Sequence, residues 1–383
     1  MLRPLLFHFF FASDALSVLP FSWLLAINLE PDSLWDTLTI IPSFVRSISK
    51  TWTHFFGSLV SLSCNMSPNS KDLQKLFDFL KVVSRVEKSP GFSSLLGLDY
   101  VSLKKDQLDY DGSTLKVQLC LTNQLRLPKQ DSVSLSTFLA VIDDTTTWAL
   151  ALADPSRSRA GVSVSLKLES GPGASKCSVG DVVQVINRTS KVGRTLGFVE
   201  AEVRDAQSNE LICSGSHIKY LPMGFLADFA LSSYGWPLVK FVSDYALSGQ
   251  EDGVGQEEKD TLLDDVFDSF HMDDDDDDDK AIFHASSIHS GLGGPLHGGC
   301  QAILMELAAT KVAKRTLMSK NVQLDSISVE YLSPPNSTDV SIEVEPKQVS
   351  ADSILARVRL ITREKCKGLG TLRFSKSPEQ SKV

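Results

Sequence analysis

The chain of 383 residues lacks the motifs of several common protein classes. Its six cysteines form no Cys-x-x-Cys pair and stand at no spacing to histidine that suggests zinc, so we expect free or buried thiols of a reducing compartment and no metal site. No basic stripe, basic arm or interleaving of basic and aromatic residues points to nucleic acid. The longest uncharged run near the N-terminus, residues 15–29, is too short and broken to predict a stable membrane span.

Negative charge is concentrated in one segment. The formal net charge is −9, and the run from Asp273 to Asp279 supplies seven of the negative charges, which leaves −2 for the rest. Such a block repels itself and cannot bury a core, so the sequence predicts a linker over residues 226–280 that ends in a disordered acidic run. A calcium site is the alternative, but the run lacks the Gly and Glu spacing of a calcium loop. Helical spacing over residues 236–247 predicts a surface helix within the linker.

The first 65 residues differ from the rest in composition. Before Glu30 the only charges are Arg3 and Asp14, and the segment is rich in Phe, Leu and Ser. This composition favours a targeting peptide that is cleaved, with a signal anchor or a non-native extension as alternatives. We therefore expect an intracellular protein of the cytoplasm, or of an organelle such as the mitochondrion or plastid if residues 1–65 are a targeting peptide.

Hydrophobic patterning predicts the same order of elements in two halves, residues 71–225 and 281–376. The first half shows a helix from 72, then a strand, an apolar helix and four strands at 115–121, 135–142, 161–168, 182–187, 199–204 and 211–220. The second half shows an extended piece, a Gly-rich turn and apolar helix, and four strands at 281–287, 290–307, 326–332, 340–344, 354–361 and 370–374. Each half is thus an α+β unit, an antiparallel sheet wrapped round a helix. A repeat of this length implies an intramolecular pseudo-twofold pair.

The triplet His297-Gly298-Gly299 opens the second apolar helix, and Glu306 follows nine residues after the histidine. Two glycines present bare backbone N–H groups at a helix N-terminus, where the helix dipole favours negative charge. Such a turn suits a carbonyl oxygen that becomes an oxyanion, and a carboxylate two turns later could serve water as a general base. The triplet alone is equally typical of a glycine hinge before a core helix. Cys300 lies just inside the helix, where we expect packing rather than nucleophilic chemistry.

The layout of both halves resembles hotdog-fold acyl-CoA thioesterases of the phenylacetyl-CoA-thioesterase-like group. In that family a turn carries His-Gly-Gly, the following helix has Asp or Glu nine residues past the His, and a later strand opens with Ser or Thr. The similarity covers residues 71–223 and 281–376, and KVGRTLGFVEAEVRD…GSHIKYLP, over residues 191–222, is similar to the family's closing strands. The resemblance implies two tandem hotdog domains that pair within the chain, act on acyl-CoA and need no cofactor. Further assembly into a homo-oligomer stays open.

The pattern of this family is divided between the halves. The second half has the glycine turn and Glu306, but Leu324 stands where the family has its Ser or Thr. The first half has Ser134-Leu135-Ser136 in place of the turn, yet it keeps Asp143 in the acid position and Ser163 in the hydroxyl position. The resemblance therefore implies one complete composite site, to which each half contributes what the other lacks.

The resemblance also implies a role for each residue of this composite site. The backbone N–H of Gly298 would polarise the thioester carbonyl, Asp143 would activate water or attack directly, and Ser163 would orient the water. His297 is expected to shape the turn by hydrogen bonding. The opposing site pairs Glu306 with a turn that has no glycine, so it would be inactive or used only for binding.

Substrate contacts are less sharply indicated. Coenzyme A carries phosphates, which Lys191 and Arg194 at a turn, or Lys219, are candidates to bind; ordinary surface charge is the alternative. Gly299 is predicted to contact substrate as part of the glycine turn. His217, within a strand, is expected to be structural.

Two other functional classes remain open. A hotdog dehydratase or hydratase would be a lyase on an acyl thioester and would use a different pairing of acid and histidine. A non-catalytic acyl-thioester binding protein is favoured by the degenerate first turn and by Leu324. Asp144 adjoins Asp143, which leaves the register of the acid position open by one residue.

Overall fold

The computed structural model describes a large part of the chain, with gaps. The described residues are 68–86, 91–99, 102–127, 133–154, 159, 161–174, 177–222, 235–236, 239, 266–272, 279–291, 295–335 and 338–377. The predicted leader over residues 1–65 and most of the predicted linker lie outside them. The described residues from Asp72 onward belong to one compact unit. Among the described helices, none combines the length and apolar character needed to cross a bilayer.

The elements of the first half surround one long apolar helix, α6. In chain order they are α4 (Pro68–Val86), α5 (Phe92–Leu95), a 3-10 turn (Lys105–Gln107), β1 (Leu108–Tyr110), β2 (Thr114–Cys120), a 3-10 turn (Asn123–Leu125), α6 (Leu135–Ala153), β3 (Val162–Ser170), β4 (Val182–Val192), β5 (Leu196–Asp205) and β6 (Leu211–Tyr220).

The second half repeats this plan around the helix α10. Its elements are β7 (Lys280–His284), a 3-10 turn (Ser287–His289), α10 (Gly298–Thr316), β8 (Val322–Tyr331), β9 (Asp339–Val349), β10 (Ser353–Thr362) and β11 (Lys365–Lys376). The strands are longer than their hydrophobic cores predict, because solvent-facing polar residues continue the ladders beyond the apolar run.

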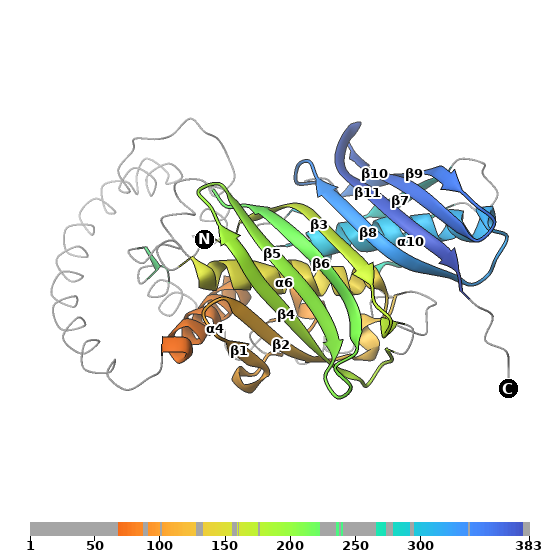
Figure 1. Cartoon of the computed structure of the whole chain (residues 1–383). Helices are drawn as coiled ribbons and strands as arrows, with labels where there is room; N and C mark the ends of the chain where they lie inside the picture. The colour runs from red at the N-terminus through yellow and green to blue at the C-terminus, as the bar shows by residue number, and fades with distance from the viewer. Residues whose placement is uncertain are drawn as a thin grey trace, which may run out of the picture. The chain divides into compact units, whose positions relative to one another are not determined.

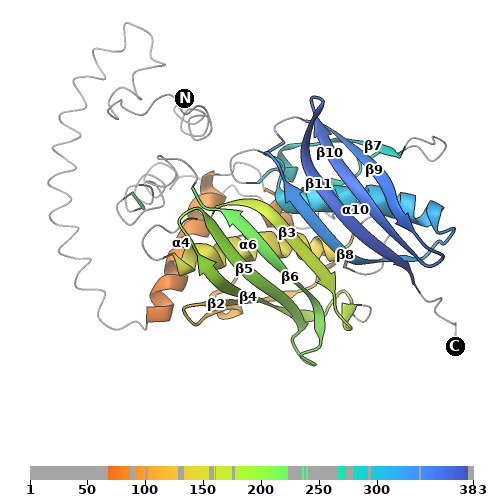
Figure 2. The same ribbon diagram turned by 45° about the horizontal axis from the view of Figure 1, so that its top comes forward.

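All eleven described strands belong to one antiparallel sheet, with the order β1-β2-β4-β5-β6-β3-β8-β11-β10-β9-β7. The two halves meet where β3 pairs with β8, for example Leu168 with Ile327. Read outward from this seam, the order β3, β6, β5, β4, β2 on one side matches β8, β11, β10, β9, β7 on the other. Figures 1 and 2 show α6 and α10 lying across the same face of the sheet, one in each half. Each half is therefore a hotdog domain, and the two are arranged as a pseudo-twofold pair.

Alternating burial explains why these strands form. In β10 the inward residues Ala356, Val358 and Leu360 are buried, while Arg357 and Arg359 between them are exposed. One face of the strand thus packs on α10 and the other meets water, as in other one-sided antiparallel sheets. The helices are apolar on nearly all sides because each contacts the sheet on one side and its partner helix on the other.

One part of the predicted linker belongs to the core. Residues 266–272 fall within the range 226–280, yet Val266 and Phe267 are buried and Phe267 packs against the ring of Phe283, with centroids 5.7 Å apart. The imidazole Nε2 of His289 lies 2.6 Å from the carbonyl oxygen of Val266. These residues of the predicted linker therefore pack on the core, through a short apolar pair that the acidic average of the segment hides.

Candidate active site

The predicted glycine turn begins α10 and faces the helix of the other domain. His297 is the N-cap of α10, with φ −58° and ψ 142°, and Gly298 is its first residue. A β-carbon placed on Gly298 would lie 2.5 Å from Oδ2 of Asp143, which projects from the middle of α6. The structure therefore brings an acid of the first domain against the helix N-terminus of the second.

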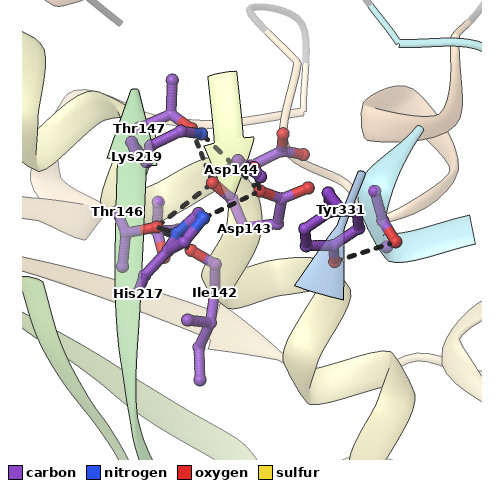
Figure 3. Close-up of polar contacts among 12 residues, drawn as sticks. Ile142, Asp143, Asp144, Thr146, Thr147, His217, Lys219 and Tyr331 are labelled. Atoms are coloured by element: carbon purple, nitrogen blue, oxygen red, sulfur yellow. Dashed lines mark hydrogen bonds and ion pairs between the residues drawn. The ribbon is translucent and has the colours of Figure 1, made fainter. Parts of the chain in front are cut away.

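Asp143 is 5% exposed, and its two oxygens have different surroundings. The hydroxyl of Ser163 donates to Oδ1 at 2.7 Å, and both Lys219 Nζ and His217 Nε2 lie 3.6 Å from the same oxygen. Figure 3 shows Lys219 and His217 reaching from β6 towards Asp143. Oδ2 instead faces Gly298. Oδ1 is thus the anchored oxygen, and Oδ2 is the one presented to the glycine turn.

Local backbone geometry aims Ser163 inward. Ser163 pairs with Lys219 across β3 and β6, but the next pair is Ser165 with Ile218, so Val164 is an extra residue in β3. A bulge of this kind bends the strand and redirects neighbouring side chains. The hydroxyl of Ser163 points to Asp143 as a result, and its proton is committed to the carboxylate.

The surroundings keep Asp143 ionised. Burial raises its pKa, but the positive charge of Lys219, with smaller contributions from His297, His217 and the Ser163 hydrogen bond, holds the pKa well below its usual range. Burial, helped by the charge of Lys219, lowers the pKa of His217 to about 3, so that imidazole is neutral near pH 7. Lys219 is therefore the main cation beside the carboxylate.

His297 connects the turn to the acid that follows Asp143. The backbone N–H of Gly299 donates to His297 Nδ1 at 3.0 Å, and His297 Nε2 lies 3.0 Å from Asp144 Oδ1. Since Nδ1 accepts a hydrogen bond, Nε2 carries the proton and donates to Asp144. Burial lowers the pKa of His297, but the charge and hydrogen bond of Asp144 and the charge of Asp143 raise it overall. This geometry is that of a residue that shapes the turn.

The two glycines of the turn have different surroundings. The N–H of Gly299 is already used by His297, and a β-carbon on Gly299 would lie 2.3 Å from the β-carbon of Ala140 on α6. Gly299 thus allows the two helices to approach, and the structure does not support its predicted contact with substrate. Among the described residues none accepts a hydrogen bond from the N–H of Gly298, so this donor is not used within the protein.

The second possible site, at the opposing pole of the pair, lies where the start of α6 meets the middle of α10, and side chains of the protein fill it. Glu306 of α10 is 3% exposed, and its Oε2 accepts the backbone N–H of Ser136 at 3.1 Å. Ser134 caps α6 by accepting the N–H of Thr137 at 3.1 Å, and Leu135 stands where the other pole has its first glycine. Glu306 therefore serves as a capping partner for the start of α6.

Replacing Glu306 with Gln is expected to leave turnover unchanged and to lower stability by about 1 kcal/mol, because a neutral amide oxygen is a weaker acceptor than a carboxylate oxygen at this helix start. Acyl-thioester turnover and thermal unfolding of the variant would be measured beside those of the unchanged protein. A large loss of turnover with unchanged stability would instead make this pole catalytic.

Several residues of the site were not recognised from sequence as belonging to it. The sequence suggests Lys219 as a contact for CoA phosphates, but its side chain is 4% exposed and lies at Asp143, which does not support that contact. Its ammonium donates to Thr147 of α6, and the neighbouring Thr146 Oγ1 lies 2.6 Å from His217 Nδ1. The hydroxyl of Tyr331, at the end of β8, donates to the carbonyl oxygen of Gly298 at 3.2 Å (Figure 3).

The alternation of β6 could have identified His217 and Lys219 as residues of the site. His217 and Lys219 are two positions apart, so they must share a face of the strand, and an inward face makes both of them buried and polar. Lys191 and Arg194 lie exposed at the end of β4 and in the turn after it. Their contact with coenzyme A stays a prediction. Cys300 is fully buried, and burial raises its pKa well above the usual value, in agreement with the predicted packing role.

Comparison with known proteins yields similarity of fold only. No protein-family model matches the chain, and no curated protein matches it in sequence. A conserved protein of unknown function with a hot dog fold from Alicyclobacillus acidocaldarius is 10% identical, with TM-score 0.46 over 71% of this chain and 96% of that chain. The tesB protein of Mycobacterium avium subs paratuberculosis is 10% identical, with TM-score 0.45 over 75% and 100%.

A further solved structure, the 12:0-ACP thioesterase from Umbellularia californica, is 10% identical, with TM-score 0.44 over 69% of this chain and 94% of that chain. At these identities and TM-scores the matches carry no argument about chemistry. The fold is assigned from the strand order, the β3–β8 seam and the two packed helices. On that evidence the chain is a tandem double hotdog protein.

Proposed function

We propose that the chain hydrolyses acyl-CoA thioesters at one composite site between its two hotdog domains. The observation that carries the proposal is the placement of the Asp143 carboxylate against Gly298 at the N-terminus of α10. A base and an oxyanion donor then lie next to each other, although they come from different halves of the chain. Acyl transfer to water needs these two groups together.

The proposed reaction begins with binding of the thioester carbonyl oxygen to the N–H of Gly298. The dipole of α10 supports the negative charge that develops on this oxygen. Oδ2 of Asp143 takes a proton from water as the water oxygen bonds to the carbonyl carbon, or Oδ2 attacks that carbon itself and water later opens the acyl intermediate. The carbon–sulfur bond breaks, and the thiolate takes up a proton, from Asp143 in the first route and from solvent in the second. The products are a free carboxylate and a free thiol, with one proton released to solvent.

The different surroundings of the two carboxylate oxygens of Asp143 support this mechanism. Oδ1 accepts the Ser163 hydroxyl and faces Lys219, which fixes the rotation of the carboxyl group. Oδ2 keeps its lone pairs for the reacting water or carbon. Ser163 then acts first on the carboxylate, and only its oxygen lone pairs could contact the water.

The proposal is tested with purified protein, a panel of acyl-CoAs of different chain length, matched acyl-pantetheines and a reagent for free thiols. Thiol release that requires Asp143 supports a hydrolase. Loss or gain of a double bond without thiol would mean a lyase, and saturable binding with neither would mean a binding protein. Comparison of acyl-CoA with acyl-pantetheine tests whether the nucleotide part of the substrate is recognised.

A further inference from the structure

A buried lysine lies beside the proposed acid. Lys219 projects from the inward face of β6, is 4% exposed, and its ammonium lies 3.6 Å from Asp143 Oδ1. The same ammonium donates to the hydroxyl of Thr147, one turn further along α6. A lysine is rarely buried without a partner, because removal of its charge from water is costly. The position of Lys219 therefore depends on the carboxylate that it faces.

The other groups around Asp143 contribute less positive charge than Lys219. The titratable and polar groups that face it from each packed element are Asp144 of α6, Ser163 of β3, His217 of β6, His297 of α10 and Tyr331 of β8. His217 is neutral, and burial raises the pKa of Tyr331 well above its usual value. His297 directs Nε2 at Asp144, 3.0 Å away, and its Nδ1 accepts the N–H of Gly299, so its influence on Asp143 is smaller than that of Lys219. Among these groups Lys219 exerts the largest positive influence on Asp143, and its ammonium lies 3.6 Å from Oδ1.

We propose that Lys219 is a positioning residue for the thioesterase reaction, whose buried ammonium neutralises the Asp143 carboxylate and, with Ser163, turns its free oxygen towards Gly298. The inference rests on the proposed function and goes beyond it, since Lys219 need not contact substrate. Burial opposes the charge of Asp143, and Lys219 is the largest influence that overcomes it. Burial also lowers the pKa of Lys219, which the charge of Asp143 partly restores, so each group depends on the other.

The test is the pH dependence of turnover in Lys219→Met and Lys219→Arg. Without the ammonium, burial dominates and the pKa of Asp143 rises, so the acid limb of kcat moves to higher pH by about one to three units, and turnover recovers above it. KM changes little. Lys219→Arg keeps the charge and returns the acid limb towards that of the unchanged protein. Lys167→Met is the matched control, because Lys167 is exposed on the neighbouring strand β3.

A second measurement does not depend on activity. Carboxyl titration by NMR, on protein labelled with ¹³C at aspartate carboxyl carbons, reports the pKa of Asp143 directly, with Asp143→Asn to identify its signal. An upward shift in Lys219→Met supports the proposal. An acid limb and a titration that both coincide with those of the unchanged protein would overturn it.

Loss of folding in Lys219→Met is also informative. If the two charges depend on each other, Lys219→Met combined with Asp143→Asn unfolds at a higher temperature than Lys219→Met alone. A double variant no more stable than that single variant would overturn the proposal. If the unchanged protein releases no thiol from any acyl thioester, the proposed function fails, while the NMR titration still decides whether Lys219 controls Asp143.

Discussion

Asp143→Asn is expected to lower acyl-thioester turnover by a factor of about 10² to 10⁴, the usual contribution of a positioned general base. The amide has nearly the same shape, and its oxygen can still accept the hydroxyl of Ser163. It cannot take a proton from water, however, and it is a much weaker nucleophile. The steady-state kcat of the variant, measured on the best acyl-CoA of the panel, checks this expectation.

The control for this experiment is the acid at the opposing pole. Glu306 occupies the equivalent place on α10, is equally buried and also contacts a helix start, so Glu306→Gln makes the same chemical change in a similar environment. Only Asp143→Asn should lose turnover. Full activity in Asp143→Asn, with both variants folded, would exclude Asp143 as the reacting acid.

The depressed pKa of Asp143 also predicts how stability depends on pH. A carboxyl group whose pKa is lower in the folded protein than in the unfolded chain contributes stability that is fully present above the unfolded pKa, about 3.9 for Asp, and is lost as pH falls towards the folded pKa. The unfolding temperature of the unchanged protein should therefore fall as the pH drops below about 4. In Asp143→Asn this fall should be shallower, because the asparagine side chain does not titrate in this pH range. Equal slopes for the two proteins would contradict the assignment.

The repeated hotdog plan was predictable because each strand carries its own periodic signal. In β5 the alternation of apolar and polar residues over 199–204 identifies a one-sided strand, and α6 and α10 show apolar stripes of helical length. The composite nature of the site could also be predicted, since the glycine turn occurs in the second half and Asp143 and Ser163 occur in the first. Their proximity follows from the pseudo-twofold pairing, which places the start of each helix beside the middle of the other.

The charge balance of the site was not predictable from the chain. From sequence alone Lys219 is expected to be a surface charge, whereas β6 places it beside Asp143 of α6. The contact of Tyr331 with Gly298 depends on the pairing of β3 with β8. These contacts join residues that are far apart in sequence and follow no local period. Gly298 and Gly299 look equivalent for the same reason, because sequence shows two glycines but not the different atoms that face each one.

The two glycines of the turn should give opposite results when each is replaced by Ala. Neither has a positive φ, so Ala causes no backbone strain, and Ala is the better helix former. At Gly299 the new methyl group would lie 2.3 Å from the β-carbon of Ala140, and the nearest atoms belong to the rigid part of α6. The helices must move apart, which is expected to cost about 1–3 kcal/mol or more.

At Gly298 the methyl group would instead lie 2.5 Å from Asp143 Oδ2, at the end of a side chain. The Asp143 side chain can shift, although this weakens its contacts with Ser163 and Lys219, so Gly298→Ala should lose less stability than Gly299→Ala while turnover falls by about 10²-fold, the usual effect of moving a reacting group by 1 Å. Thermal unfolding and kcat of both variants form the test. If Gly298→Ala were fully active, Asp143 Oδ2 would not need its place against the start of α10, and the composite site would lose the contact on which it is built.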